Sequence, residues 1–272
     1  MNKKNKKEIV KEIANEVYND AIKPTTKNVG QFFGIVSEFF TTVVVYPLKK
    51  LSIEFKEKTI AFERGMKEKY NNIPEEKRVE PNLSIVGPTM EALKYRILED
   101  ELAEMFSNLL ISNLDMDKHV KCSPSYIKII EQMSSVDAIV YKKIVEKYEN
   151  RSMPICSCIF ELAGFSEKKL ANDRLPKNII DKDDFNMDEY VLSKSIDSLS
   201  RLGLITISNT RSIPDNNVYE KLIKQDYIIK LLNEYNSEKT YFVPKIHEKG
   251  VIYISEFSKD FAKVCITDKK NK

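Results

Sequence analysis

Glycine is scarce in this chain: only seven of its 272 residues are glycine, whereas lysine, glutamate and isoleucine are abundant. Few glycines disfavour an all-β sandwich, which needs many tight turns, and abundant lysine and glutamate favour helices. A chain of this length is long enough for a sizeable core in one or two domains. The composition therefore predicts a mainly α protein.

Cysteine is also rare, and the four examples are Cys122, Cys156, Cys158 and Cys265. Their spacing matches neither a disulfide framework nor the paired CxxC pattern of a structural zinc site. The basic first residues are followed by Glu8, where a signal peptide would need an uninterrupted apolar stretch. We therefore expect a reduced protein that resides in the cytoplasm.

Neither sign of charge dominates, because 44 basic residues nearly match 41 acidic ones and the net charge is +3. This balance excludes the strong positive field that marks an obligate nucleic-acid binder. The sequence also lacks a GxGxxG loop, a P-loop lysine, a nucleophile elbow and an HExxH motif. We therefore expect no cofactor, no metal and no enzymatic activity, although a site assembled from scattered residues would escape a motif search.

Two short stretches contain residue types that bind metals. The first holds Asp115, Asp117, His119 and Cys122. These four lack the paired spacing of a zinc site, so we interpret the stretch as a polar loop between helices. The second stretch, residues 181–184, does not continue as a calcium loop, because Leu192 stands where the terminal glutamate is required.

The longest apolar stretch runs from Phe32 to Leu48. As a helix it would be about 25 Å long, against about 30 Å of bilayer hydrocarbon. Glu38 would be costly in hydrocarbon, so the sequence favours a buried or peripheral helix. A membrane-inserted helix stays open as an alternative, because two glycines provide the spacing that lets membrane helices pack closely. The candidate residues for membrane or partner contact are Gly30, Phe32, Phe33, Gly34, Phe39, Phe40 and Val44.

The first 133 residues read as an N-terminal helical bundle that contains the apolar helix 32–48. Apolar residues recur at helical spacing, and Pro24 and Pro47 mark helix ends. The pattern predicts a helix up to Pro24, a second over residues 27–46, a long third one from Pro88 to Leu114 and a short fourth one from Ser123 to Met133. Residues 70–82 read as a connector.

Residues 134–272 read as a winged-helix-like α+β region with a small β-wing and insertions. Gly203 is placed to end a recognition helix over residues 188–202. The other predicted elements are helices at 136–149, 155–163, 218–233 and 258–266, and wing strands at 204–207 and 251–254.

The predicted recognition helix is slightly acidic, which argues against binding to duplex DNA. Asp188, Glu189 and Asp197 oppose only Lys194 and Arg201 along it. We therefore expect this helix to serve packing or protein contacts, with DNA binding as the weaker alternative. The candidate nucleic-acid or partner contacts are Ser193, Lys194, Ser195, Ser198 and Arg201.

Several short motifs recur in a recognisable order along the chain. They are the segments 18–24 (YNDAIKP), 46–49 (YPLK), 85–88 (IVGP), 101–106 (ELAEMF) and 123–126 (SPSY), with Gly30 and Glu80-Pro81 between them. Over roughly residues 15–204 the chain resembles the Abi-alpha family, a bacterial domain of unknown function named for abortive infection. The resemblance implies a role in defence against bacteriophage, and it supplies no catalytic residues.

We therefore expect a non-enzymatic component of anti-phage defence that acts through protein–protein contacts. Two alternatives remain: a membrane-acting effector that uses the helix 32–48, and a DNA-binding winged-helix regulator. A protein partner or a phage factor is the expected ligand. Self-association and association of the cytoplasmic protein with a membrane are left open.

Overall fold

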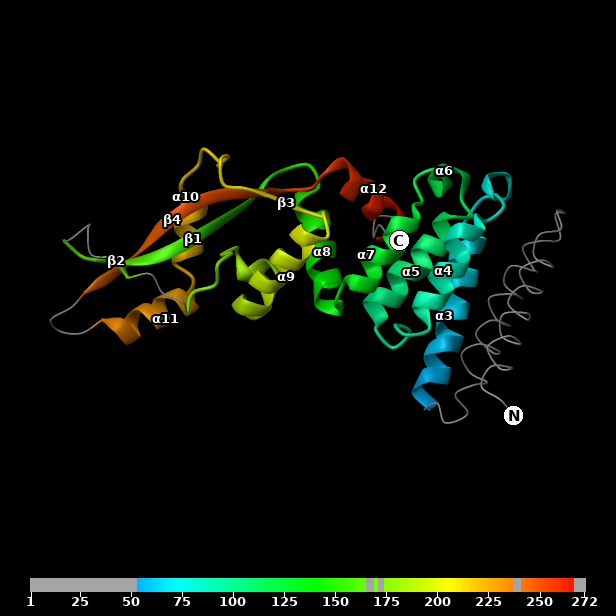
Figure 1. The fold of residues 1–272 in the computed structure, drawn as a ribbon, viewed down its shortest axis with the longest axis horizontal. Helices are drawn as coiled ribbons and strands as arrows, with labels where there is room; N and C mark the ends of the chain where they lie inside the picture. Colours follow the sequence, from blue (N-terminus) through cyan, green and yellow to red (C-terminus); the bar gives the residue numbers. More distant parts are fainter. Residues whose placement is uncertain (1–52, 165–168, 171–173, 237–240, 267–272) are drawn as a thin grey trace, which may run out of the picture. The chain divides into compact units, whose positions relative to one another are not determined.

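The computed structural model describes residues 53–164, 169–170, 174–236 and 241–266. Its described part is mostly helical with one small antiparallel sheet, which confirms the predicted fold class at this level (Figure 1). The helices predicted before residue 53 lie outside these ranges. So do the seven candidate contacts on the apolar stretch, namely Gly30, Phe32, Phe33, Gly34, Phe39, Phe40 and Val44. Within the described ranges no helix is long and apolar enough to cross a bilayer.

The chain divides into two compact units. The described part of unit 1 consists of residues 53–131 and 264–266, and unit 2 lies within residues 132–263. The predicted domain boundary after residue 133 stays a prediction, because compactness alone does not show that a segment folds independently.

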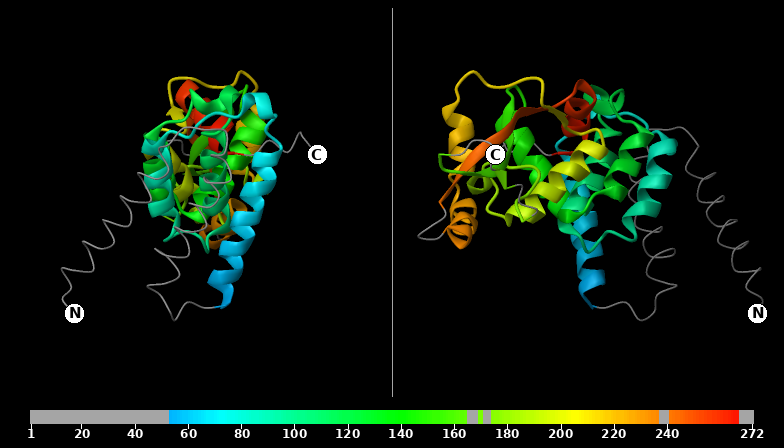
Figure 2. Two further views of the ribbon diagram at one scale, coloured as in Figure 1. Left: turned by 90° about the vertical axis from the view of Figure 1, so that its right-hand side faces the viewer. Right: turned by 60° about the vertical axis from the view of Figure 1, so that its left-hand side comes forward.

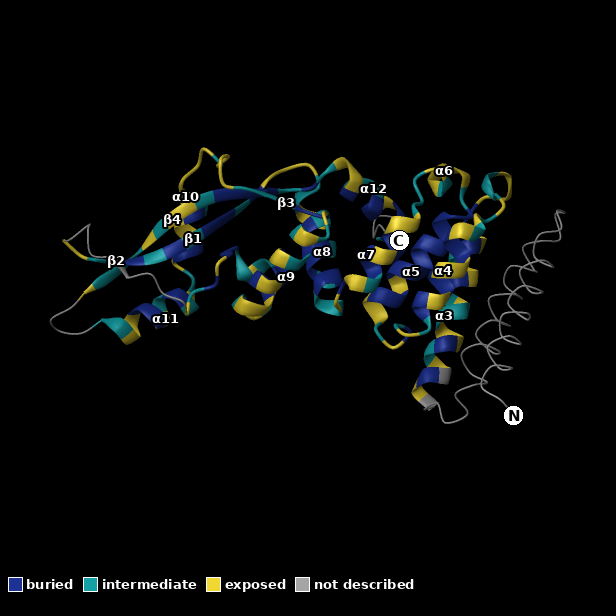
Figure 3. Cartoon of the chain, in the orientation of Figure 1, coloured by how far each residue is buried: buried dark blue, intermediate teal, exposed yellow. Residues whose placement is uncertain are grey.

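Unit 1 is built from helices, and its core centres on one of them. The helices are α3 (Ile53–Asn71), α4 (Leu83–Leu93), α5 (Asp100–Ser112), α6 (Met116–His119) and α7 (Pro124–Gln132), with the short 3-10 turn η2 (Glu75–Lys77). On α5, Leu102, Phe106, Leu109 and Leu110 are fully buried. Their spacing places them on one broad face, so α5 is the central helix of this core (Figure 3).

The single long helix predicted from Pro88 to Leu114 is wrong, because α4 and α5 are separate helices. The break between them is held by Arg96, which donates hydrogen bonds to Glu99 Oε1 and to the Glu131 carbonyl, both at 2.7 Å. Apolar periodicity continues across the break, so it could not reveal this turn.

A polar cluster in unit 1 receives the end of the last helix, α12 (Glu256–Cys265). Asn108 Nδ2 donates to the Cys265 carbonyl at 3.0 Å, which satisfies one of the carbonyls that a helix end leaves unpaired. Lys69 Nζ in turn donates to Asn108 Oδ1 at 2.7 Å and pairs with Glu104 at 2.8 Å. Burial lowers the pKa of Lys69 despite the charge of Glu104. This cluster therefore holds Cys265, the last residue of α12, within unit 1 by specific polar contacts.

Unit 2 is a mixed α+β unit. Its elements are α8 (Ser135–Tyr148), β1 (Met153–Leu162), β2 (Lys169–Leu170), the 3-10 turn η3 (Lys182–Asp184), α9 (Glu189–Arg201), β3 (Thr206–Ser208), α10 (Asn217–Ile223), α11 (Asp226–Tyr235), β4 (Phe242–Tyr253) and most of α12. The strands are antiparallel in the order β2-β1-β4-β3. Helices α10 and α11 pack against the long β1–β4 ribbon (Figure 2).

The helix predicted at residues 155–163 is wrong, because this segment is strand β1. Cys156, Cys158 and Phe160 alternate along it and join the buried cluster beneath α10 and α11. Burial of every second residue is typical of a strand. The predicted helix 218–233 is two helices, α10 and α11, and the predicted return strand 251–254 is only the end of β4. The winged-helix arrangement is therefore not confirmed.

Tyr141 of α8 offers a test of the packing within unit 2. Its hydroxyl donates to the Ser258 carbonyl at 2.7 Å, and its ring lies 5.6 Å from that of Phe261. Tyr141→Phe keeps the ring and leaves the buried carbonyl without this donor. We expect the free energy of unfolding to fall by about 1–2 kcal/mol in urea titrations. The matched control Tyr95→Phe alters a side chain that is 75% exposed and should change stability little; equal losses in both variants would contradict this account.

Candidate functional site

Helix α9 is the best-defined candidate for a functional surface, and its two ends are fixed by local sequence. The Asp188 carboxylate accepts hydrogen bonds from the backbone N–H groups of Tyr190 and Val191, at 3.0 and 3.1 Å. At the other end Gly203 adopts a φ of 73°, and Leu204 N–H donates to a carbonyl five residues back. This confirms the predicted role of Gly203, since a positive φ is easily adopted only by glycine.

The inner face of α9 is held by a buried carboxylate of α8. Ser195 Oγ donates to Asp137 Oδ1 at 2.7 Å, and Ser198 Oγ donates to Asp137 Oδ2 at 3.1 Å. The backbone N–H of Ser134 donates to the same carboxylate at 2.9 Å, while the Ser134 hydroxyl caps α8. Asp137 is therefore both a capping residue of α8 and the acceptor that fixes α9 beside it.

A second polar contact holds the preceding segment to α9. The backbone N–H of Asn178 donates to Ser193 Oγ at 3.2 Å, and its side-chain amide donates to Asp197 Oδ1 at 2.8 Å. Ser193, like Ser195, is buried. Of the five predicted contact residues, the three serines thus form hydrogen bonds within the protein.

The outer face of α9 carries the residues that a partner can reach. Lys194 and Arg201 are exposed, although Arg201 also donates to Gln132 Oε1 at 2.9 Å. Beside them Tyr190 is 48% exposed and Val191 is 43% exposed. We call Tyr190, Val191, Lys194 and Arg201 the α9 patch. It combines a tyrosine and an arginine, two residue types that are enriched at protein interfaces, with a valine and a lysine, which are not.

Sequence reasoning missed the two apolar members of the α9 patch. Neither Tyr190 nor Val191 is among the predicted contact residues, yet the buried apolar residues of this helix are only Leu192, Ile196 and Leu199. The spacing of these three defines the inward direction, and Val191 lies one position away from it. That offset is the signal by which the sequence could have shown Val191 at the surface.

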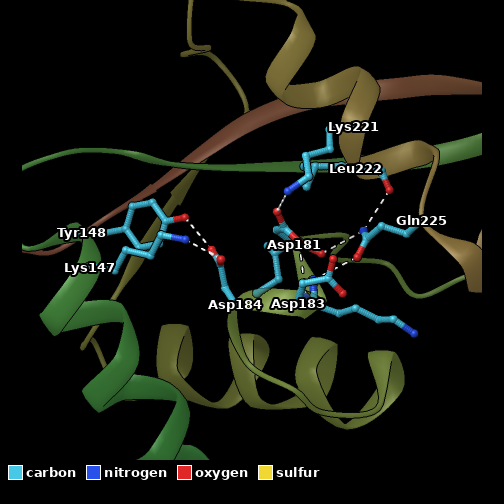
Figure 4. A network of polar contacts seen from close by, with 10 residues as sticks. Lys147, Tyr148, Asp181, Asp183, Asp184, Lys221, Leu222 and Gln225 are labelled. Carbon is cyan, nitrogen blue, oxygen red and sulfur yellow. Dashed lines mark hydrogen bonds and ion pairs between the residues drawn. The ribbon is translucent and has the colours of Figure 1, made fainter.

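The turn that leads into α9 is fastened on two sides by charged contacts (Figure 4). Asp184 forms an ion pair with Lys147 and accepts a hydrogen bond from the Tyr148 hydroxyl at 2.9 Å. Asp181 forms an ion pair with Lys221 of α10 at 2.5 Å. Burial raises the pKa of Asp184, but the hydrogen bonds from Lys147 and Tyr148 outweigh it and hold the pKa below its ordinary value.

Gln225, between α10 and α11, completes this network through its side-chain amide. Its Nε2 donates to the carbonyls of Ile180 and Leu222, at 3.0 and 2.9 Å. Its Oε1 accepts the backbone N–H of Lys182 at 2.9 Å. The polar groups of residues 181–184 therefore attach this turn to α8, to α10 and to Gln225, which is a structural role (Figure 4).

A polar hollow of about 440 Å³ adjoins this turn. It is lined by Lys182, Asp183, Asn217, Glu220, Lys221, Lys224, Gln225 and Asp226. Three lysines face three carboxylates in this lining, so no net charge selects an anion or a cation. Ligand pockets are usually lined by apolar side chains with a few convergent polar groups, and this hollow differs from that pattern.

In the described part of the chain, no group of three or more His, Cys, Asp and Glu side chains is placed to hold a metal ion. The loop stretch that contains metal-binding residue types has local structural contacts instead. Asp115 caps α6 by accepting the Asp117 N–H, and Asp117 forms an ion pair with Lys77 at 2.6 Å. His119 Nδ1 lies 2.9 Å from the Asn113 carbonyl.

Removing the central carboxylate tests how α9 is held. Asp137→Ala takes three hydrogen bonds from α8 and α9 and leaves the buried Ser195 hydroxyl unpaired, so we expect a loss of about 2–4 kcal/mol in the free energy of unfolding. Glu146→Ala, which removes an exposed carboxylate of α8 itself, should cost less than about 1 kcal/mol. Urea unfolding followed by far-UV circular dichroism measures both. A loss at Asp137 no larger than at Glu146 would show that the Asp137 carboxylate is not central.

The lowered pKa of Asp184 predicts how stability depends on pH. Because the folded-state pKa lies below that of the unfolded chain, its contribution is complete above pH about 4 and disappears as the pH falls through the folded value. Asp184→Asn should therefore destabilise the protein at pH 7, and the difference from wild type should shrink as the pH falls below about 4. Asp183→Asn, at the exposed neighbour, serves as the control. A difference that stays constant with pH would rule out the ionised pair.

Comparison with known proteins adds the family. No curated protein and no solved structure gives a significant match. A family model described as abortive infection alpha matches residues 54–265, which include nearly all the described residues of both units. The motifs at 18–24 and 46–49 precede the matched range, whereas those from 80 to 126 fall within it. The chain belongs to the abortive infection alpha family.

Proposed function

We propose that this protein is a non-enzymatic component of bacterial defence against bacteriophage, of the abortive infection type, and that it acts by binding a protein partner or a phage factor. Membership in the abortive infection alpha family suggests the defence role. The α9 patch carries the proposal of protein contacts. It exposes Tyr190 and Val191 beside Lys194 and Arg201. Aromatic residues and arginine contribute much of the binding energy at protein interfaces.

The way in which α9 is held supports the same conclusion. Its inner face is bound to Asp137 through Ser195 and Ser198, and its first turn is capped by Asp188. A partner would therefore meet side chains on a helix whose backbone is already fixed. Less conformational entropy is lost when such a pre-organised surface binds.

The chemistry of the cysteines supports a non-enzymatic role in a reducing compartment. All four cysteines are free thiols. Burial raises the pKa of Cys156 to about 12 and that of Cys158 to about 11. These thiols are protonated at physiological pH, and a thiol is a weak nucleophile compared with a thiolate. We accordingly propose that the protein resides in the cytoplasm.

The winged-helix-like interpretation of unit 2 is retained only as a proposal for its scaffold. The order α8, β1, α9, β3 and β4, with β4 paired between β1 and β3, supports it. The turn η3 stands where a second helix would be expected. On this proposal α9 takes the position of a recognition helix and uses it for protein contacts.

Phage challenge of cells that express the intact protein tests the proposed function. The double variant Tyr190→Ala/Val191→Ala should lose protection, with the plating efficiency of the phage rising at least about tenfold, because truncating an interface anchor costs more than about 1 kcal/mol. Tyr95→Ala removes an exposed tyrosine of unit 1 and is the matched control. Expression level and circular dichroism are compared for all three proteins.

Two outcomes would contradict the proposal. Protection equal to wild type in the double variant would exclude the α9 patch as the contact surface. Absence of any protection by the wild-type protein, across a panel of phages, would contradict the defence role itself.

A further inference from the structure

The β1–β4 ribbon has an outer edge that is only partly covered. Strand β4 pairs with β1 from Phe242 to Ile252, which is all but its last residue. On its other side β3 covers only Val251 to Tyr253. Among the described strands none pairs with this outer side between Phe242 and Ile246, a segment that we call the β4 edge. An uncovered strand edge is a template for another strand.

At Phe242, the first residue of the β4 edge, the backbone groups form hydrogen bonds with a side chain. Asn236, directly after α11, accepts the backbone N–H of Phe242 through Oδ1 at 2.6 Å. Its Nδ2 donates to the Phe242 carbonyl at 3.2 Å. A facing residue in an antiparallel strand exchanges this same pair of bonds with its partner. The Asn236 amide thus takes the place of a neighbouring strand at this position.

At the next position where the backbone groups of β4 point away from β1, the backbone has no hydrogen-bond donor. Backbone groups alternate in direction along a strand, and the register with β1 is regular from Phe242 to Ile246. The amide nitrogen that follows Phe242 on the outer side therefore belongs to Pro244, which has no N–H. Proline at an edge position prevents one ladder hydrogen bond from forming.

An irregularity in the ribbon limits the length of the β4 edge. Ser157 of β1 faces Glu248, whereas the next residue, Cys158, faces Ile246. His247 is therefore an extra residue in β4, and such a bulge bends and twists the strand. Asn236, Pro244 and this bulge together leave a short edge with one complete outward-facing residue, Ile246.

We propose that Asn236 and Pro244 guard the β4 edge against strand addition by a second copy of this chain. The fitting partner is the same edge of another copy, because an antiparallel edge-to-edge pair is self-complementary about a two-fold axis. Edge lysines commonly oppose such pairing. Here the charge of Lys245 is compensated by Glu161, whose carboxylate oxygens lie 3.0 and 2.9 Å from its Nζ. The protection of the β4 edge thus depends on the Asn236 hydrogen bonds and on the missing N–H of Pro244, and not on charge. Replacing both residues exposes an edge that can pair with its own copy.

The test uses the intact chain and three variants. Asn236→Ala removes the substitute bonds, Pro244→Val restores the missing N–H, and the double variant does both. Asn233→Ala, an exposed asparagine on the same helix, is the matched control. Hydrogen exchange measures protection of the β4 edge, and sedimentation velocity over a concentration series measures self-association.

We expect the Phe242 amide to exchange at least about tenfold faster in Asn236→Ala than in wild type or Asn233→Ala, because its acceptor is gone. The weight-average mass of the double variant should rise with concentration toward twice the wild-type value. Unchanged exchange in Asn236→Ala would overturn the guarding contact. Faster exchange without any gain in mass of the double variant would overturn strand addition. If the double variant does not fold, Pro244→Val alone provides the test, because this substitution removes no hydrogen bond. Its weight-average mass should also rise with concentration, but by less than is expected for the double variant.

Discussion

A buried carboxylate determines which face of α9 is exposed. Asp137 accepts hydrogen bonds from the backbone of its own helix start and from two serines of α9. A buried carboxylate must be satisfied by donors, since leaving it unpaired costs several kcal/mol. Only one rotation of α9 brings Ser195 and Ser198 to this acceptor. That rotation turns Tyr190 and Val191 outward, so the exposed patch is a consequence of the buried contact.

The same principle recurs where backbone groups would otherwise be unpaired. Asn108 pairs with a carbonyl at the end of α12, Gln225 pairs with two carbonyls beside η3, and Asn236 pairs with both backbone groups of Phe242. Side-chain amides are suited to this role, because each carries both a donor and an acceptor. In this fold they hold chain segments in places where helix and strand ladders do not extend.

Much of the architecture could be predicted from the sequence, and the failures share a cause. The helix predicted over residues 188–202 with Gly203 after it is confirmed as α9 and its end. The stretch 155–163 was mistaken for a helix because a short apolar run does not distinguish a buried strand from a helix. The residues of its partner strand β4 lie about 80 to 100 positions further along the chain, and it is this pairing that makes the segment a strand. A local sequence pattern does not indicate which distant strand a segment will pair with.

The sequence by itself determined the mainly helical character of the chain, the glycine that ends α9 and the membership in the abortive infection alpha family. These depend on local spacing and on short motifs, which a single chain displays. Only the tertiary structure decided that Ser193, Ser195 and Ser198 face inward while Lys194 and Arg201 remain accessible. It also decided that Asn236 closes an edge of the sheet. The physical reason is that hydrogen-bond partners such as Asp137 and Phe242 are brought to these side chains by folding, and no spacing in the sequence specifies which polar groups will meet.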